Sequence, residues 1–229
     1  MQTIIKKSGF LLINKPVGPT SFGVIAKLRK ITGIKKIGHA GTLDPFASGV
    51  LVVAIGREAT RLISQYVKLD KEYEAVLHLG AVTDTFDRTG KLEVRSEKLE
   101  MDRFDIENVL IKYTGKQKQT PPMFSAKKVG GKKLYELARK GIEIERKAVE
   151  INIYELELLE YNYPLLKIRV KCSSGTYIRS LAHDIGQNLG CGAYLTELKR
   201  TAVGVFGIEE CCELADIQED DWGSVLFSA

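Results

Sequence analysis

The chain has 229 residues, of which 44% are hydrophobic and 28% are charged, as is typical of a globular protein with a sizeable core. No apolar run approaches the ~20 residues of a membrane-spanning helix. Lysines follow a very short apolar patch at the N-terminus, so we do not expect a signal peptide. Four cysteines without paired spacing predict free thiols in a cytoplasmic protein. Three histidines outside any metal motif argue against a catalytic metal.

Hydrophobic periodicity and Gly or Pro punctuation predict the elements of the chain. We expect strands at 9–13, 50–55, 71–80, 91–95, 149–160, 165–172 and 193–203, of which 149–160 and 165–172 form a pair. We expect helices at 21–32, 57–66 and 102–113, a basic helix around Leu134, a helix from Ile178 to Leu189 and a short helix near 211–218. Residues 119–126 are expected to be extended. In the first helix, the apolar residues that recur at helical spacing are Phe22, Ile25, Leu28 and Ile31. Because no regular βαβ rhythm appears, we expect an α+β fold with a long mixed, mainly antiparallel sheet flanked by helices.

The net charge of +5 is unevenly distributed along the chain. Lysines and arginines gather at residues 27–36 and 127–147, whereas Asp and Glu gather at residues 209–221. Such asymmetry is typical of a protein that binds a polyanion with one face. The alternative is that these charges lie on ordinary solvated helix faces.

One acid, Asp44, lies in the glycine-rich stretch 38–51, on a loop that leads into the strand at 50–55 and is called the Asp44 loop below. Pro45 disfavours helical geometry at Asp44, and the glycines permit tight turns or the close approach of another backbone. A rigid loop that carries one acid between apolar neighbours is a typical placement for a catalytic carboxylate. The alternative is a turn aspartate that bonds its own backbone.

Two further side chains are candidates for function. Arg179 falls in the first turn of a helix, where the macrodipole disfavours a cation, so we expect a carboxylate or phosphate partner. The alternative is an ordinary surface arginine. Tyr73, on the apolar face of its strand, is either a core tyrosine or an aromatic platform for a base.

Several short motifs, taken together, resemble those of the TruB family of tRNA pseudouridine synthases. They are Gly9–Pro16, Thr20-Ser21, His39–Pro45, Lys71-Glu72-Tyr73, Thr83-Asp84-Thr85, Pro122–Ala126, Gly131–Arg139, Ser174–Arg179 and Leu198-Lys199-Arg200. They follow the family's order across residues 9–207, which is nearly the whole chain.

The resemblance implies a pseudouridine synthase fold that isomerises uridine 55 in the T loop of tRNA. It implies Asp44 as the catalytic aspartate, Tyr73 as the active-site tyrosine and Arg179 as the partner of the aspartate. His39 matches a histidine that packs in the region of the flipped base. The residues expected to contact the RNA are Lys15, Pro16, His39, Gly41, Thr42, Lys127, Lys132, Lys133, Tyr177 and Leu198.

Two features depart from the family pattern. Phe124 stands where a tyrosine is usual before Ser-Ala, which removes a hydroxyl group. Most bacterial members carry a C-terminal PUA domain, for which 229 residues leave no room. We therefore expect a single catalytic domain over residues 1–229 and no PUA domain.

The implied chemistry agrees with the residues present. Breaking an N-glycosidic bond and re-forming it through carbon needs a carboxylate and a group that moves the C5 proton, but no metal or cofactor. A retaining glycosidase needs a second catalytic carboxylate, which the Asp44 motif does not offer. The base must leave its stack, which suits an aromatic side chain beside the acid. The residues leave open whether Asp44 adds to C6 of the base or acts on the ribose.

We therefore expect a monomeric enzyme whose partner is the T-arm stem-loop of tRNA. One alternative is a tRNA-binding RNA chaperone with secondary or absent catalysis, against which the intact Asp44, Tyr73 and Arg179 argue. Another alternative is a metal-free nucleoside hydrolase. The basic blocks argue against it, because a small substrate does not need an extended cationic surface.

Overall fold

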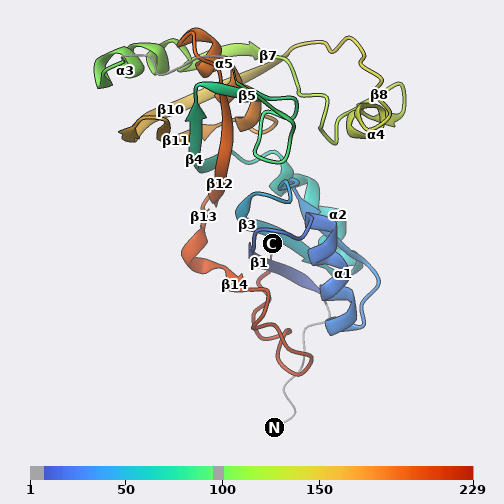
Figure 1. The fold of residues 1–229 in the computed structure, drawn as a ribbon. Coiled ribbons are helices and arrows are strands. Elements are labelled where there is room, and N and C mark those ends of the chain that lie inside the picture. Colours follow the sequence, from blue (N-terminus) through green and yellow to red (C-terminus); the bar gives the residue numbers. More distant parts are fainter. Residues whose placement is uncertain (1–7, 95–100, 229) are drawn as a thin grey trace. The chain divides into compact units, whose positions relative to one another are not determined.

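The structure is a computed structural model that describes residues 8–94 and 101–228. The chain divides into two compact units, one of Met1–Glu72 with Lys199–Ala229 and the other of Tyr73–Leu198 (Figure 1). We describe each unit by itself. The expected single catalytic domain stays a prediction.

The first unit is built on strands whose two faces are both covered. Its elements are β1 (Gly9–Lys15), α1 (Ser21–Thr32), β2 (Ile37–Ala40), β3 (Ser48–Ile55), α2 (Gly56–Val67), the end of β12 (Ala193–Val203), β13 (Phe206–Gly207), the 3-10 helix η1 (Ile208–Glu210) and β14 (Cys212–Glu213). The strand order is β14-β1-β3-β12, with β2 beside β3 and β13 beside β12. β1 and β3 are antiparallel, whereas β14 with β1 and β12 with β3 are parallel.

Alternate residues of β1 and β3 feed two separate cores. On one face, Leu11 and Leu51 pack with Leu28 of α1 and with Trp222 near the C-terminus. On the other face, Leu12 and Val52 belong to a core that includes Ala59 and Tyr66 of α2. A strand buried on both faces reads as a continuous apolar run, which explains why 50–55 has no polar residue.

Helix α1 begins and ends where the sequence predicts. The Thr20 side chain accepts a hydrogen bond from the Gly23 amide at the N-terminus, and Gly33 adopts the left-handed conformation that ends the helix. Ile25 and Leu28 are buried, but Phe22 is 63% exposed. Phe22 recurs at helical spacing with them, but its position lies at the edge of the apolar stripe and not in the core.

The second unit contains most of the antiparallel pairing. Its elements are β4 (Lys71–Leu79, from Tyr73), β5 (Ala81–Thr83), β6 (Leu92–Val94), α3 (Arg103–Lys112), β7 (Gly115–Gln119), β8 (Lys128–Val129), β9 (Lys132–Lys133), α4 (Leu134–Ala138), β10 (Val149–Asn162), β11 (Leu165–Cys172), α5 (Ile178–Asn188) and β12 up to Leu198. The strand order is β12-β4-β11-β10-β7. On β4, Tyr73, Ala75, Leu77 and Leu79 are buried in strict alternation, as predicted. The predicted α+β fold with a large mixed, mainly antiparallel sheet is confirmed.

One predicted element is wrong, and one extends beyond the described residues. The helix expected near 211–218 is absent: Cys212 pairs with Ile13 of β1, so sheet pairing prevails over the helical spacing of Leu214 and Ile217. The strand expected at 91–95 is present at Leu92–Val94, and Arg95 lies outside the described residues. In the described part of the chain, no helix is both long and apolar enough to cross a membrane.

Candidate active site

The centre of the Asp44 loop is fixed by Ser21 in the first turn of α1. The buried Ser21 hydroxyl donates to the Leu43 carbonyl oxygen over 3.0 Å and accepts from the Leu43 amide over 2.9 Å. On the other side of Asp44, the Gly18 amide donates to the Pro45 carbonyl oxygen over 2.8 Å. Because Leu43 is tied to the Ser21 side chain and Pro45 to the Gly18 backbone, the position of the half-buried Asp44 is closely defined.

A buried arginine, Arg200, holds two further points of the loop and its strand. Its Nε donates to the Val50 carbonyl oxygen over 2.7 Å, and its Nη2 donates to the Gly41 carbonyl oxygen over 3.2 Å. The pairing of β12 with β3 places Arg200 opposite Gly49. Gly49 has φ +109°, and an added Cβ would lie 2.1 Å from the Arg200 carbonyl oxygen, so no other residue fits there.

Lys15 is fully buried beside this loop, and its ammonium shapes the neighbouring turn. The Nζ atom donates to the carbonyl oxygens of Pro16 and Pro19 over 2.8 and 2.9 Å. Burial lowers the pKa of Lys15 to about 8. The positive charge of Arg200 also lowers it, whereas the negative charge of Asp44 raises it. Lys15, Asp44 and Arg200 are therefore close enough to influence one another's charge. The expected contact of Lys15 with RNA stays a prediction.

His39 lies on β2, half-buried, and belongs to the same electrostatic group. Burial and the Arg200 guanidinium both lower its pKa, which favours the neutral imidazole. Its Nδ1 is buried and has no hydrogen-bond partner among the described residues. The first unit thus brings together three residues predicted from the sequence, Lys15, His39 and Asp44, and adds Arg200.

The other expected RNA contacts of this unit lie at or near its surface. Pro16 and Thr42 are exposed, and Gly41 is half-buried with φ +83°. An added Cβ at Gly41 would lie 3.4 Å from Nη1 of Arg200, so this glycine lets the arginine approach the loop.

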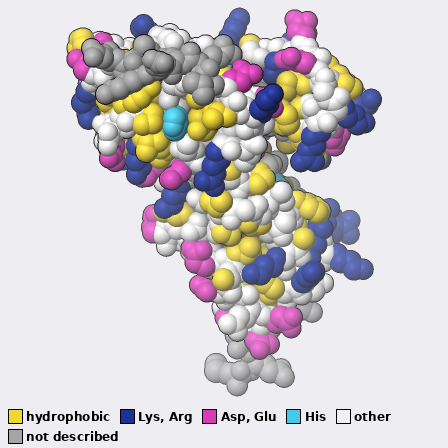
Figure 2. Space-filling model, in the orientation of Figure 1, with side chains coloured by type: hydrophobic (Ala, Val, Ile, Leu, Met, Phe, Trp, Pro, Cys, Tyr) yellow, Lys and Arg dark blue, Asp and Glu magenta, His cyan; other side chains and the backbone are white. Residues whose placement is uncertain are grey.

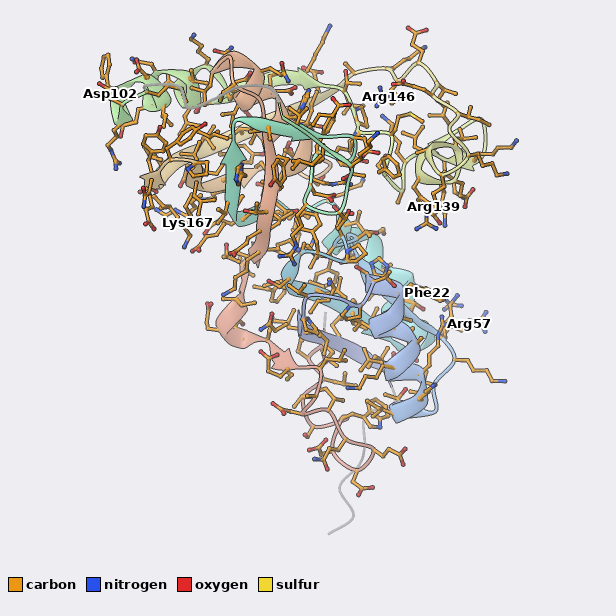
Figure 3. All side chains as sticks on the ribbon, viewed as in Figure 1. Phe22, Arg57, Asp102, Arg139, Arg146 and Lys167 are labelled. Carbon is orange, nitrogen blue, oxygen red and sulfur yellow. The ribbon has the colours of Figure 1, made fainter. Side chains whose placement is uncertain are left out.

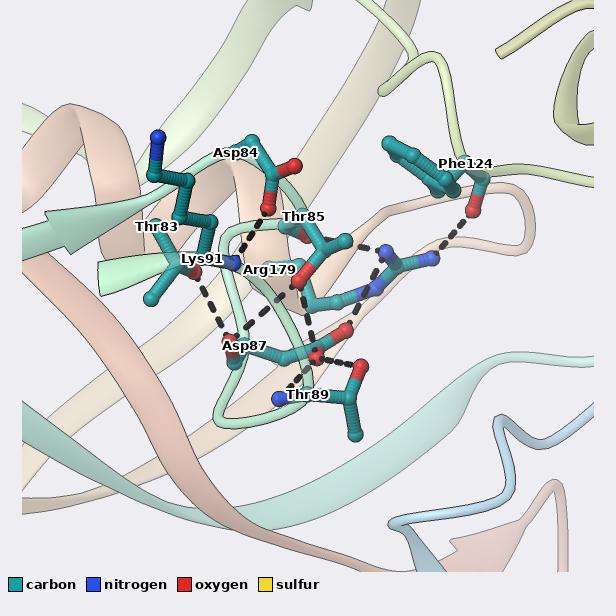
Figure 4. A network of polar contacts seen from close by, with 8 residues as sticks. All are labelled: Thr83, Asp84, Thr85, Asp87, Thr89, Lys91, Phe124 and Arg179. Carbon is teal, nitrogen blue, oxygen red and sulfur yellow. Dashed lines mark hydrogen bonds and ion pairs between the residues drawn. The ribbon is translucent and has the colours of Figure 1, made fainter. Parts of the chain in front are cut away.

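In the second unit, Arg179 occupies the centre of a polar network (Figure 4). Its Nη1 lies 3.3 Å from Oδ2 of Asp87 and donates to the Thr85 carbonyl oxygen over 3.0 Å. Its Nη2 donates to the Phe124 carbonyl oxygen over 2.7 Å. Asp87 is a carboxylate partner of the kind that the helix position of Arg179 predicts. The pairing of Arg179 with Asp44 stays a prediction.

Asp87 is held as firmly as the arginine. Its Oδ1 accepts from the Thr89 amide over 2.9 Å, from the Thr89 hydroxyl over 2.5 Å and from the Thr85 hydroxyl over 3.0 Å. Leu195 of β12 donates to the Phe86 carbonyl oxygen and accepts from the Arg88 amide, on either side of Asp87. The carboxylate is thus fixed by its own turn and by a strand, and it orients the guanidinium.

Tyr73 and Tyr177 belong to the same unit as this network and lie on different elements. Tyr73 is buried on β4, so the structure agrees with a core position without testing a catalytic role. Tyr177 directly precedes α5, and the buried Gln119 side chain accepts from its amide and donates to its carbonyl oxygen, over 2.8 and 3.0 Å. This clamp fixes the start of the helix that carries Arg179. Leu198, near the end of β12, is buried.

The expected lysine contacts lie on a short hairpin, β8–β9, that leads into α4. Gly130 and Gly131 form its two-residue turn with φ of +57° and +80°, which a glycine pair allows. Lys132 is exposed, and Lys127 and Lys133 are half-buried. The Lys133 ammonium and the Arg139 guanidinium each lie 5.4 Å from the centre of the Tyr135 ring. The hairpin therefore presents cations around an aromatic side chain.

Four residues that organise the site were not singled out from the sequence: Ser21, Asp87, Gln119 and Arg200. Asp87 lies in the polar loop after β5, and Arg200 closes the last motif of the family resemblance. The loop and the motif that contain these two residues are visible in the sequence, but only the fold shows what the two side chains contact. Within residues 8–94 and 101–228, no three His, Cys, Asp or Glu side chains are grouped to hold a metal ion.

Comparison with known families matches nearly the whole of the described chain. The model described as "TruB family pseudouridylate synthase (N terminal domain)" matches residues 29–178. The model described as "tRNA pseudouridylate synthase B C-terminal domain" matches residues 179–223.

Individual relatives agree with these matches. A tRNA pseudouridine synthase B from Chlamydia felis is 52% identical over 90% of this chain and 87% of its own length. That of Protochlamydia amoebophila is 54% identical over 91% of this chain and 79% of its own. A chain of the solved Cbf5-Nop10-Gar1 complex is 34% identical, with a TM-score of 0.72. The match covers 92% of the present chain and 53% of the chain in that complex.

Proposed function

Because the chain belongs to the TruB family of pseudouridylate synthases, we propose that it converts uridine to pseudouridine in tRNA, at uridine 55 of the T loop. Relatives named tRNA pseudouridine synthase B support the substrate class. The choice of uridine 55 rests on the family resemblance. The observation that carries the proposal is the rigid loop around Asp44, which lies within the residues that the family model matches.

The reaction requires no net oxidation and no added group. The bond from ribose C1′ to uracil N1 breaks, a bond from C1′ to C5 forms, C5 loses a proton and N1 gains one. In our proposal the Asp44 carboxylate starts this sequence, either by adding to C6 of the base or by acting on the ribose. A closely held carboxylate suits this role, because its geometry is set before the substrate arrives.

Tyr73 and Arg179 are the other catalytic residues of the proposal. The family resemblance assigns Arg179 as the partner of Asp44, and the ion pair with Asp87 would keep its guanidinium oriented for that contact. Tyr73 would stack on the extruded uridine and pass the C5 proton through its hydroxyl. His39, whose lowered pKa favours the neutral imidazole, would pack in the region of the flipped base.

The phosphates of the T arm would be held by cations away from the reacting base. Lys127, Lys132 and Lys133 lie on or next to the β8–β9 hairpin, which suits contacts that position an RNA without reading its sequence. The expected monomeric state and cytoplasmic location stay predictions.

The test is to incubate the protein with an unmodified tRNA transcript and to map pseudouridine by position. We expect modification at uridine 55 alone. Modification elsewhere would contradict the position, and no modification would contradict the function. Release of free uracil would identify a nucleoside hydrolase, whereas improved tRNA folding without pseudouridine would identify a chaperone.

Two conservative variants separate the proposed roles. Tyr73→Phe keeps the ring, so we expect normal RNA binding and a reaction stopped before C5 loses its proton. Arg179→Lys keeps the charge but loses the planar fork, so we expect the single-turnover rate to fall far more than RNA affinity. If rate and affinity fall equally in Arg179→Lys, this arginine contacts phosphate instead.

A further inference from the structure

Phe22 is an apolar side chain exposed where the sequence pattern places a core residue. Its ring is 63% exposed on α1, while Ile25 and Leu28 of the same helix are buried. The Arg29 guanidinium lies 5.5 Å from the ring centre, and its Nη2 donates to the Ile37 carbonyl oxygen over 3.4 Å. The arginine is therefore held in place against the ring, and most of the ring surface remains open to solvent.

The surface around this pair is strongly cationic. The sequence contains no Asp or Glu before Asp44, and α1 carries only basic charges. Figure 2 shows Lys and Arg side chains with hydrophobic side chains between them on the visible face of this unit, and Figure 3 labels Phe22 on α1.

This surface is directly connected to the Asp44 loop. Phe22 follows Ser21, whose hydroxyl is bonded to Leu43, the neighbour of Asp44. Two Cα steps of ~3.8 Å and one hydrogen-bonded contact put the Cα atoms of Phe22 and Asp44 within about 15 Å. One or two nucleotides of an extended RNA strand span that distance.

We propose that Phe22, braced by Arg29, is a stacking platform for an unpaired base of the RNA near the uridine that Asp44 acts on. An exposed ring beside cations suits a nucleotide, because the base stacks on the ring while its phosphates meet Arg29 and neighbouring cations. Helix α1 itself carries lysine and arginine but no acid, which favours the phosphates of an RNA over a protein partner. The inference deepens the proposed function and rests on it.

The experiment measures RNA binding and stacking at this position directly. T-arm hairpin RNAs, each with 2-aminopurine at one loop position, are titrated with the wild-type protein and with Phe22→Ala, Phe22→Tyr and Phe104→Ala. Phe104 is the matched control, because it is also an exposed phenylalanine (68%) but lies on α3 in the other unit. Substitution at an exposed site leaves stability nearly unchanged, which thermal unfolding verifies.

We expect fluorescence quenching at one loop position near the target uridine. Phe22→Ala should lose this quenching and bind the hairpin about tenfold more weakly, while Phe22→Tyr and Phe104→Ala should match the wild type. If Phe22→Ala quenches and binds like the wild type, the inference is wrong. It is also wrong if Phe22→Ala changes only the oligomeric state, which would assign this surface to a protein contact.

These outcomes are distinct from a failure of the proposed function. If the wild-type protein makes no pseudouridine in tRNA, the function itself is wrong. If it modifies tRNA, and Phe22→Ala does so with unchanged KM and binding, only the stacking platform is wrong.

Discussion

The Arg179 guanidinium lies 3.3 Å from the Asp87 carboxylate, and both side chains are 5% exposed. Two buried charges are tolerated because each has further partners: the carbonyl oxygens of Thr85 and Phe124 for the arginine, and the turn around Thr89 for the aspartate. The pair therefore fixes the guanidinium in one orientation. Removing Asp87 takes away a charged partner of a buried guanidinium, which is costly.

Asp87→Asn should accordingly destabilise the protein by about 3 kcal/mol and slow pseudouridine formation more than it weakens RNA binding. The amide keeps the shape of the carboxylate but not its charge. Denaturant unfolding and single-turnover kinetics measure the two effects. Asp84→Asn, an exposed change in the same loop, is the control and should behave like the wild type. Equal effects of the two variants would refute the role of Asp87.

Gly49→Ala should destabilise the protein more than any surface glycine does. Its Cβ would lie 2.1 Å from the Arg200 carbonyl oxygen, at a φ of +109°. Gly33→Ala is the comparison, because Gly33 also has a positive φ (+69°) but an added Cβ meets nothing within 4 Å. Gly33→Ala should cost only the ~1–2 kcal/mol of a left-handed residue. Similar melting temperatures for the two variants would contradict this account of the Asp44 loop.

Asp184 on α5 should make stability depend on pH in a defined window. Burial raises its pKa from 3.8 to about 6, so between these values the folded protein binds more protons than the unfolded chain. Stability from this group therefore falls as pH rises from about 4 to 6. Asp184→Asn should stabilise the protein at pH 7 by about 1 kcal/mol, after partial solvent screening, and less at pH 4. Unfolding curves at both pH values measure the difference, and a variant less stable at pH 7 would contradict it.

Lys15 should have the opposite dependence on pH. Its pKa is lowered from 10.5 to about 8, so the unfolded chain binds more protons than the folded protein between these values. Stability from this group therefore rises with pH from about 8 to 10.5. Lys15→Met removes the titrating group, so the difference in unfolding free energy between wild type and variant should change across this window. A constant difference would show that the Lys15 ammonium is not desolvated.

The elements that the sequence predicts well are those with strong local signals. Helix α1 has a threonine cap and a terminal glycine, and β4 alternates strictly from Tyr73 to Leu79. The elements that it misses depend on distant partners. β2 is a short strand defined by pairing with β3, and β14 exists because Cys212 lies beside β1. No local pattern contains that information.

The same distinction applies to the candidate site. Proline and glycine around Asp44 predict a stiff loop from local chemistry alone. The hydrogen bonds that hold it come from Ser21, 22 residues before its partner Leu43, and from Arg200 near the other end of the chain. Arg179 could be predicted to need a carboxylate, but its helix position does not name Asp87. The exposure of Phe22 could not be predicted either, because helical spacing alone does not distinguish the centre of an apolar stripe from its edge.

The most direct test of the central claim is the Asp44→Asn variant, prepared free of host enzyme and assayed on tRNA carrying tritium at C5 of uridine. Asparagine keeps the size of the side chain and the hydrogen bonds of the loop but removes the charge. We predict that the wild type releases tritium, whereas the variant releases none and binds tRNA with unchanged affinity. Tritium release by Asp44→Asn above background would contradict the assignment of Asp44 as the catalytic carboxylate.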